Sequence, residues 1–82
     1  MATRRQIQDL FITALALPPD TDFPSLAYRS VPQWDSVAHM SLIARLEAAF
    51  GVMLETDDVL DMSSFEECLR ILARHGVQVE DA

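Results

Sequence analysis

The sequence predicts an all-α fold, a small four-helix bundle with three main helices, one short helix and a long loop between helices one and two. The chain has 82 residues, 50% of them hydrophobic, which suits one domain with one core. Apolar residues recur at helical spacing in three segments, and capping or stop signals flank them. No segment has a convincing strand pattern, so we expect no sheet.

The first helix is expected over residues 3–16. Thr3 followed by Gln6 has the spacing of a capping box, in which each side chain bonds the other residue's backbone N–H. Pro18 and Pro19 mark the end, because proline cannot continue a helix. The apolar stripe follows the i, i+3, i+4, i+7 pattern and consists of Ile7, Leu10, Phe11 and Ala14.

A long loop is expected over residues 17–35, which hold all four prolines of the chain. Most connections in compact domains take about 4–6 residues, so a loop of this length needs anchoring. Its apolar side chains indicate that it is pinned across the core, with a turn of helix around residues 24–28. These side chains are Phe23, Leu26, Tyr28 and Val31.

The second helix is expected over residues 36–50, with Gly51 as its C-terminal stop. Its wide apolar face comprises Val37, Met40, Leu42, Ile43, Leu46 and Phe50. A tight link follows, and then a short helix over residues 56–61 for which Thr56 is the expected cap.

The last helix is expected over residues 64–75, followed by a frayed tail at 77–82. Two serines begin it, and each is followed three residues later by a glutamate, which doubles the capping-box signal. The inner stripe comprises Phe65, Cys68, Leu69 and Leu72. Three methionines are expected to fill gaps in the core, namely Met40, Met53 and Met62.

The charge balance restricts the partners. Thirteen acids against six bases give a formal net charge of -7. Such a surface repels nucleic acids and anionic membranes and favours partners with basic patches. The sequence has no signal-peptide pattern, no run that could span a membrane and only one cysteine. We therefore expect a cytoplasmic monomer without membrane insertion or disulfide.

Ser36 has three possible interpretations. The simplest is that Asp35 caps a helix and Ser36 belongs to its first turn. A second is catalysis, because Asp35, Ser36 and His39 are the residue types of a hydrolytic triad. Adjacent residues diverge on a helix, however, and no glycine-rich turn offers an oxyanion hole. We therefore expect no catalysis by this chain.

The third interpretation is covalent attachment, which depends on a longer pattern. Asp35-Ser36-Val37 begins the second helix, an acidic segment follows, and a two-residue serine step opens the last helix. The spaced residues between them are Leu42, Leu46, Glu47, Phe50 and Leu54. Over residues 34–72, without a gap, the chain resembles an acyl carrier protein of the stand-alone type. The Asp-Ser-Val motif alone is weak, but these spacings in an acidic chain of this length are specific.

The resemblance implies that Ser36, flanked by Asp35 and Val37, anchors 4'-phosphopantetheine. A magnesium-dependent phosphopantetheinyl transferase would supply this group from coenzyme A, and its thiol would carry an acyl group as a thioester. The resemblance also implies partner enzymes that load and transfer the acyl group in lipid or secondary-metabolite biosynthesis. An aminoacyl or peptidyl cargo remains open. The anionic phosphodiester suits the positive end of a helix.

The second helix departs from the family pattern because it carries few acids, Glu47 among them. Negative charge is concentrated over residues 55–67 instead, where it forms either a docking surface or a solvated face. This departure favours a dedicated pathway over general fatty-acid synthesis. The candidate contact residues are Trp34, His39, Met40, Glu47, Asp57, Asp58 and Asp61. The acids lack the spacing of a calcium loop, so no metal site is expected.

Trp34 and His39 flank the attachment motif. We expect Trp34 to staple the start of the helix or to touch the pantetheine arm. We expect His39, one turn from Ser36, to be an exposed contact residue. An alternative from another class is an unmodified helical interaction module that binds a partner through its acidic or apolar surface. The two hypotheses differ at Ser36, which only a carrier presents for modification.

Overall fold

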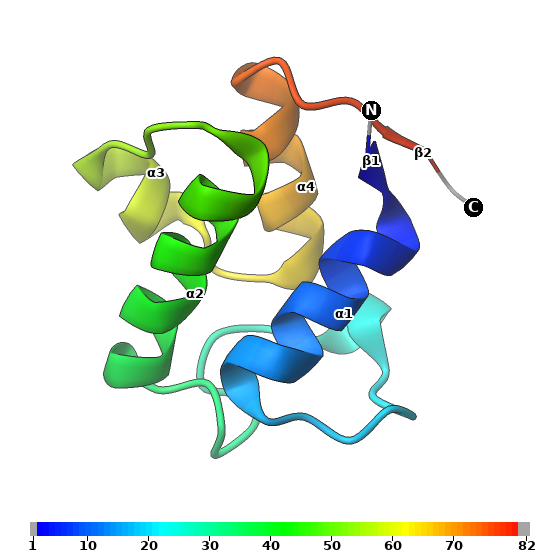
Figure 1. The fold of residues 1–82 in the computed structure, drawn as a ribbon. Helices are drawn as coiled ribbons and strands as arrows, with labels where there is room; N and C mark the ends of the chain where they lie inside the picture. Colours follow the sequence, from blue (N-terminus) through cyan, green and yellow to red (C-terminus); the bar gives the residue numbers. More distant parts are fainter. Residues whose placement is uncertain (1, 81–82) are drawn as a thin grey trace.

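The computed structural model describes residues 2–80 and is mostly helical (Figure 1). Its four α-helices are α1 (Arg4–Leu15), α2 (Ser36–Phe50), α3 (Thr56–Asp61) and α4 (Phe65–Arg74). The predicted fold class, three main helices and one short one, is confirmed. Within residues 2–80, no helix combines the length and apolarity that crossing a membrane requires.

Side-chain caps fix the starts of α1 and α4. The hydroxyl of Thr3 accepts the N–H of Gln6 at 3.2 Å, and the Gln6 side chain accepts the N–H of Thr3 at 2.9 Å, so the predicted capping box forms. At α4 the hydroxyl of Ser64 accepts the N–H of Glu67 at 3.0 Å. Ser64, the second serine of the step, is therefore the N-cap.

The short helix α3 is capped by Glu55, and the prediction of Thr56 was wrong. Thr56 is the first helical residue, and Glu55 forms a capping box with Asp58, whose carboxylate accepts the Glu55 N–H at 3.1 Å. The Asp58 carboxylate thus satisfies a backbone N–H at the start of α3, where the positive helix end favours acidic side chains.

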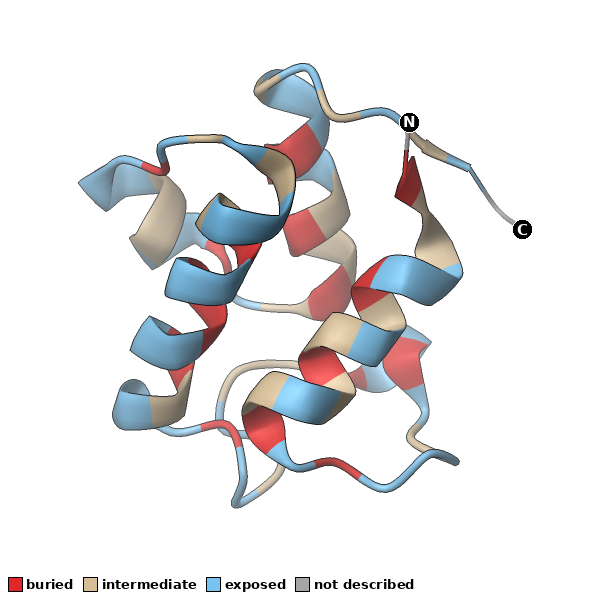
Figure 2. Cartoon of the chain, in the orientation of Figure 1, coloured by how far each residue is buried: buried red, intermediate tan, exposed pale blue. Residues whose placement is uncertain are grey.

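The buried residues of α1, α2 and α4 lie on the sides of these helices that face the interior (Figure 2). At the centre, the ring of Phe11 meets Trp34 and Phe65 edge to face, at centroid distances of 5.5 and 5.0 Å. Cys68 is fully buried, and this burial raises the pKa of its thiol to about 12. Of the three methionines expected in the core, only Met62 is buried. Met40 is 57% exposed and Met53 81%, so the prediction was wrong for both.

The long loop is pinned as expected. Phe23 and Leu26 are buried, and the loop forms a short 3-10 turn, η1 (Phe23–Ser25), slightly before the predicted position. The N–H of Tyr28 donates to the carbonyl of Ser63 at 2.8 Å, and that of Phe65 donates to the carbonyl of Leu26 at 3.0 Å. These two bonds tie the loop to the start of α4.

Two short strands correct the expectation of no sheet. β1 (Ala2–Thr3) and β2 (Val79–Glu80) pair in parallel, so the tail is not frayed at these positions. Ala2 is buried and Val79 is partly buried against the core, so the two paired segments are also held by apolar contacts. A pairing of two residues is too short to leave a periodic pattern in the sequence. Residues 81–82 of the predicted tail lie outside the described residues.

Candidate functional site

Asp35 and Ser36 occupy the positions that the sequence predicts at the start of α2. The carboxylate of Asp35 accepts the N–H of Ala38 at 2.9 Å and is the N-cap. Ser36 is the first residue of the helix and is exposed. Ser36 is therefore accessible, and the capped helix fixes the backbone that bears it.

An apolar groove lies beside Ser36, between α2 and α3. Its volume is about 290 Å³. Its walls are formed by Tyr28, Ser36, His39, Met40, Val59, Leu60, Met62 and Ser63. Leu60, which lines the groove, is 73% exposed, and Val37, next to Ser36 in the sequence, is 79% exposed. Exposed aliphatic side chains around a groove are suited to binding an apolar chain, and Ser36 offers a hydroxyl for its attachment.

A larger hollow of about 570 Å³ lies at the other end of α2, among α1, the Phe50 end of α2 and the segment around Val77. No charged or nucleophilic side chain lines it. The smaller groove is the better candidate site, because apolar side chains and the hydroxyl of Ser36 line it.

Trp34 and His39 are buried, so the expectation that they are surface contacts was wrong. Trp34 precedes the N-cap and packs on His39 in the second turn of α2, which is the contact expected of a staple. Trp34 is fully buried and its ring packs edge to face on Phe11 and Tyr28. Its indole N–H donates to Nδ1 of His39 at 2.9 Å. Nε2 of His39 lies 2.8 Å from the carbonyl oxygen of Val59. Both ring nitrogens of His39 thus have partners, and neither is left to accept a proton from Ser36.

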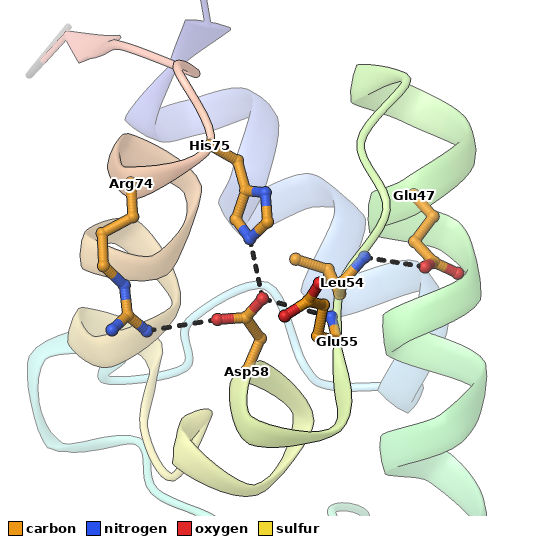
Figure 3. A network of polar contacts seen from close by, with 6 residues as sticks. All are labelled: Glu47, Leu54, Glu55, Asp58, Arg74 and His75. Carbon is orange, nitrogen blue, oxygen red and sulfur yellow. Dashed lines mark hydrogen bonds and ion pairs between the residues drawn. The ribbon is translucent and has the colours of Figure 1, made fainter.

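The acids proposed as contacts separate into two groups. Glu47 is partly buried, and its carboxylate accepts the N–H of Leu54 at 3.0 Å (Figure 3). Asp58 is bonded to Nε2 of His75 at 2.7 Å and to Arg74 at 3.3 Å. These two carboxylates hold the structure together and are poorly placed to meet a partner. Asp57 and Asp61 are exposed.

Ion pairs neutralise part of the negative charge carried by residues 55–67. Glu66 pairs with Arg4 of α1, and Glu67 pairs with Arg70 one turn along α4. The dense negative charge seen in the sequence is therefore partly neutralised within the fold. Asp57 and Asp61, one turn apart on α3, are the two candidate contacts of this segment that remain exposed.

The bonds to Asp58 give a testable pH dependence. The hydrogen bond from His75, and then that from the backbone of Glu55, hold the pKa of the Asp58 carboxyl below its ordinary value. An unfolded aspartate titrates near about 3.9, so Asp58 stabilises the fold above about pH 4, and this contribution is lost as the pH falls through its folded pKa. The melting temperature of Asp58→Asn should lie below that of the wild type at pH 6, and the difference should shrink towards pH 3. The exposed Asp57→Asn should show no such trend; an equal trend would contradict the assignment.

Some groove residues were missed by the sequence analysis. Tyr28 was expected only to pin the loop, and neither Val59 nor Leu60, in the short acidic helix, was predicted to be a site residue. An available signal was Leu60, an apolar residue between Asp57 and Asp61 in a helix too short to bury every side.

Arg29, beside Tyr28, has a left-handed backbone (φ 65°) and places its guanidinium 5.4 Å from the centre of the Tyr28 ring.

Comparison of the chain with protein-family models, curated proteins and solved structures finds no match. The sequence motif and the geometry around Ser36 are therefore the basis for a functional assignment.

Proposed function

We propose that the protein is an acyl carrier that bears 4'-phosphopantetheine on Ser36 and presents an acyl or aminoacyl thioester to partner enzymes in the cytoplasm. The observation that carries this proposal is an exposed serine hydroxyl at the capped start of α2, beside an apolar groove. When attached, the group would supply a thiol for thioester formation. The chain itself would supply the anchor, the groove and the docking surface.

The residues around Ser36 fit such a group. The first N–H groups of a helix have no acceptor within it, and those of Ser36 and Val37 belong to this first turn. They can meet an anionic phosphodiester at the positive end of the helix, which contributes about 0.3–1 kcal/mol at an exposed site. The apolar walls of the groove can cover part of an arm or an acyl chain.

The outward face of α2 supports a dedicated set of partners. The exposed residues of this helix are Ser36, Val37, Met40, Ser41, Ala44, Arg45, Ala48 and Ala49. None carries a carboxylate, and Glu47 is engaged with Leu54. A partner would meet a surface of small and apolar side chains with one cation, Arg45, and negative charge on α3 at Asp57 and Asp61. This distribution favours enzymes of one pathway, in lipid or secondary-metabolite biosynthesis, over general fatty-acid synthesis.

Modification of Ser36 can be tested by intact mass. The protein is incubated with coenzyme A, magnesium and a broad-specificity phosphopantetheinyl transferase. A gain of one phosphopantetheine is expected for the wild type and none for Ser36→Ala. Ser41→Ala is the matched control, because Ser41 is exposed on the same helix. An unmodified wild type, under conditions that convert a known carrier, would falsify the proposal.

Loss of the cap should affect both stability and modification. Asp35→Ala removes the acceptor for the N–H of Ala38 and should lower the free energy of unfolding by about 1 kcal/mol. It should also slow transferase modification of Ser36, because the enzyme must meet a formed helix start. Urea unfolding and the initial rate of mass gain measure the two effects. Wild-type values for both would show that Asp35 does not cap α2 in solution.

The alternative is an unmodified interaction module. The specific observation in its favour is the exposure of the aliphatic side chains of Val37 and Leu60, which could meet a partner without any attached group. The mass experiment separates the two hypotheses, because an interaction module has no reason to accept phosphopantetheine.

A further inference from the structure

Arg29 lies next to the start of α2, because the long loop turns back on itself before the helix begins. The N–H of Arg29 donates to the carbonyl of Trp34 at 3.1 Å. That carbonyl belongs to the peptide bond that joins Trp34 to Asp35, and Ser36 is the next residue, with its Cα about 3.8 Å from that of Asp35. This hydrogen bond therefore places Arg29 beside the residues that form the candidate site.

The turn that carries Arg29 is held by the side chain of Ser30. Its hydroxyl donates to the carbonyl of Ala27 at 2.7 Å and accepts the N–H of Ala27 at 3.0 Å. Within this turn Arg29 has a φ of 65°, a left-handed conformation that residues other than glycine, asparagine and aspartate seldom adopt. An arginine thus occupies a position where a glycine or an asparagine would fit with less strain, and such outliers often mark functional positions.

The guanidinium of Arg29 lies over a wall of the groove beside Ser36. Its central carbon is 5.4 Å from the centre of the Tyr28 ring, and Tyr28 and Ser36 line the same groove. The hydrogen bond of this side chain with Tyr28, and to a smaller extent the negative charge of Asp35, raises the pKa of Arg29 above its ordinary value. The guanidinium is therefore exposed to solvent and within electrostatic reach of the residue before Ser36.

A phosphodiester on Ser36 would stand next to a like charge, because the carboxylate of Asp35 precedes it. This carboxylate is held at the helix start by the N–H of Ala38. The walls of the groove offer no cation to offset the repulsion, since His39 is the one basic residue among them and both of its ring nitrogens have partners. A compensating positive charge must come from outside the groove.

Arg29 is the arginine that can supply this charge. All six residues of the Lys and Arg class are arginines, and four of them form ion pairs with carboxylates elsewhere in the fold, namely Arg4, Arg5, Arg70 and Arg74. Arg45 lies more than two helical turns beyond Ser36 on α2, about 13 Å along the axis. Salt screens exposed charges beyond roughly 8 Å at physiological ionic strength, so Arg45 is too distant to act on Ser36.

We propose that Arg29 binds the phosphate ester carried by Ser36 and so holds the first part of the attached arm against the Tyr28 side of the groove. A guanidinium suits this task, because its planar fork can donate two parallel N–H bonds to phosphate oxygens. The identity of the arm rests on the proposed function. The effect of Arg29 on a phosphate ester at position 36 does not, and it can be measured without a transferase.

The first test uses the full chain with phosphoserine incorporated at position 36. The second ionisation of a phosphoserine has a pKa of about 6, which ³¹P NMR follows directly. A guanidinium beside the phosphate favours the dianion, so this pKa should rise by about 0.5 unit when Arg29→Asn is introduced, at low salt. Asparagine is chosen because it is uncharged and tolerates the left-handed backbone of residue 29.

Arg45→Gln is the matched control for the phosphoserine titration. It also removes one exposed positive charge, and it should leave the phosphate pKa unchanged. Arg29→Lys keeps the charge without the planar fork and should retain part of the effect. The proposal is overturned if the phosphate has the same pKa in Arg29→Asn as with Arg29 present, or if Arg45→Gln raises it equally.

A second measurement needs no substitution at Arg29. In the phosphoserine protein, the side-chain Nε–H resonance of Arg29 should move with the titration of the phosphate, while that of Arg45 stays in place. The same Arg29 resonance should differ between the unmodified protein and the protein that carries phosphopantetheine. An Arg29 resonance that follows neither the phosphate titration nor the modification would contradict the proposal, whether or not Arg29→Asn folds.

The two proposals fail separately. A chain that no transferase modifies can still have a phosphoserine pKa that depends on Arg29. A chain that accepts phosphopantetheine on Ser36, but whose phosphate does not respond to Arg29→Asn, would be a carrier whose arm Arg29 does not hold.

Discussion

Replacing Trp34 by alanine is expected to lower the free energy of unfolding by about 3–5 kcal/mol, the usual cost of truncating a large buried aromatic side chain. Trp34 is fully buried and packs against Phe11, Tyr28 and His39. A domain of this size has roughly 4–12 kcal/mol of stability at about 0.05–0.15 kcal/mol per residue, so this variant should be largely unfolded or close to it. Urea unfolding followed by circular dichroism measures the effect, since the variant has no tryptophan to report by fluorescence.

Trp34→Phe separates packing from hydrogen bonding. It keeps an aromatic ring against Phe11 but removes the N–H that His39 accepts, so it should cost about 1–3 kcal/mol for an unsatisfied buried group. Met53→Ala is the control, because Met53 is 81% exposed and its loss should change stability by no more than about 0.5 kcal/mol. A Trp34→Ala protein as stable as Met53→Ala would contradict the burial of Trp34.

Local signals in the sequence predicted the helices well. Thr3 with Gln6, Asp35 and Gly51 act on neighbours three or four residues away, so the chain order alone contains the information. The pairing of β1 with β2 joins opposite ends of the chain and leaves no local pattern. Helix starts and stops are therefore readable from this sequence, whereas contacts between distant segments are not.

The candidate site likewise has some features that local sequence signals predict and others that depend on distant segments. The position and exposure of Ser36 follow from the helix start, which is local. The burial of Trp34 and His39 depends on how the long loop crosses the core, and the engagement of Asp58 depends on His75, 17 residues later. A count of charges over residues 55–67 could not show which carboxylates form hydrogen bonds or ion pairs within the fold.

Reversing Asp57 and Asp61 to lysine is expected to slow association of the transferase by up to about tenfold at low salt, because charges on a docking surface act mainly on the encounter rate. Both carboxylates are exposed and lie one turn apart on α3. Salt screens exposed charges beyond roughly 8 Å at physiological ionic strength, so the variant should also show a flatter salt dependence. The initial rate of phosphopantetheine transfer against salt concentration, below saturation, measures both effects. Asp58 is left unchanged, because its reversal would break the contact with His75.

The matched control for this variant is Asp20→Lys with Asp22→Lys, in the loop that follows α1. Each Asp-to-Lys exchange raises the net charge by two, so both double variants change the formal net charge from -7 to -3. If total charge guides the transferase, both should slow it equally; if α3 docks, only the Asp57 and Asp61 variant should. Glu47→Lys should act through stability, because it removes the acceptor for the N–H of Leu54. A folded Glu47→Lys protein that is no longer modified, beside an unaffected α3 variant, would place docking on α2 and leave Asp57 and Asp61 as a solvated face.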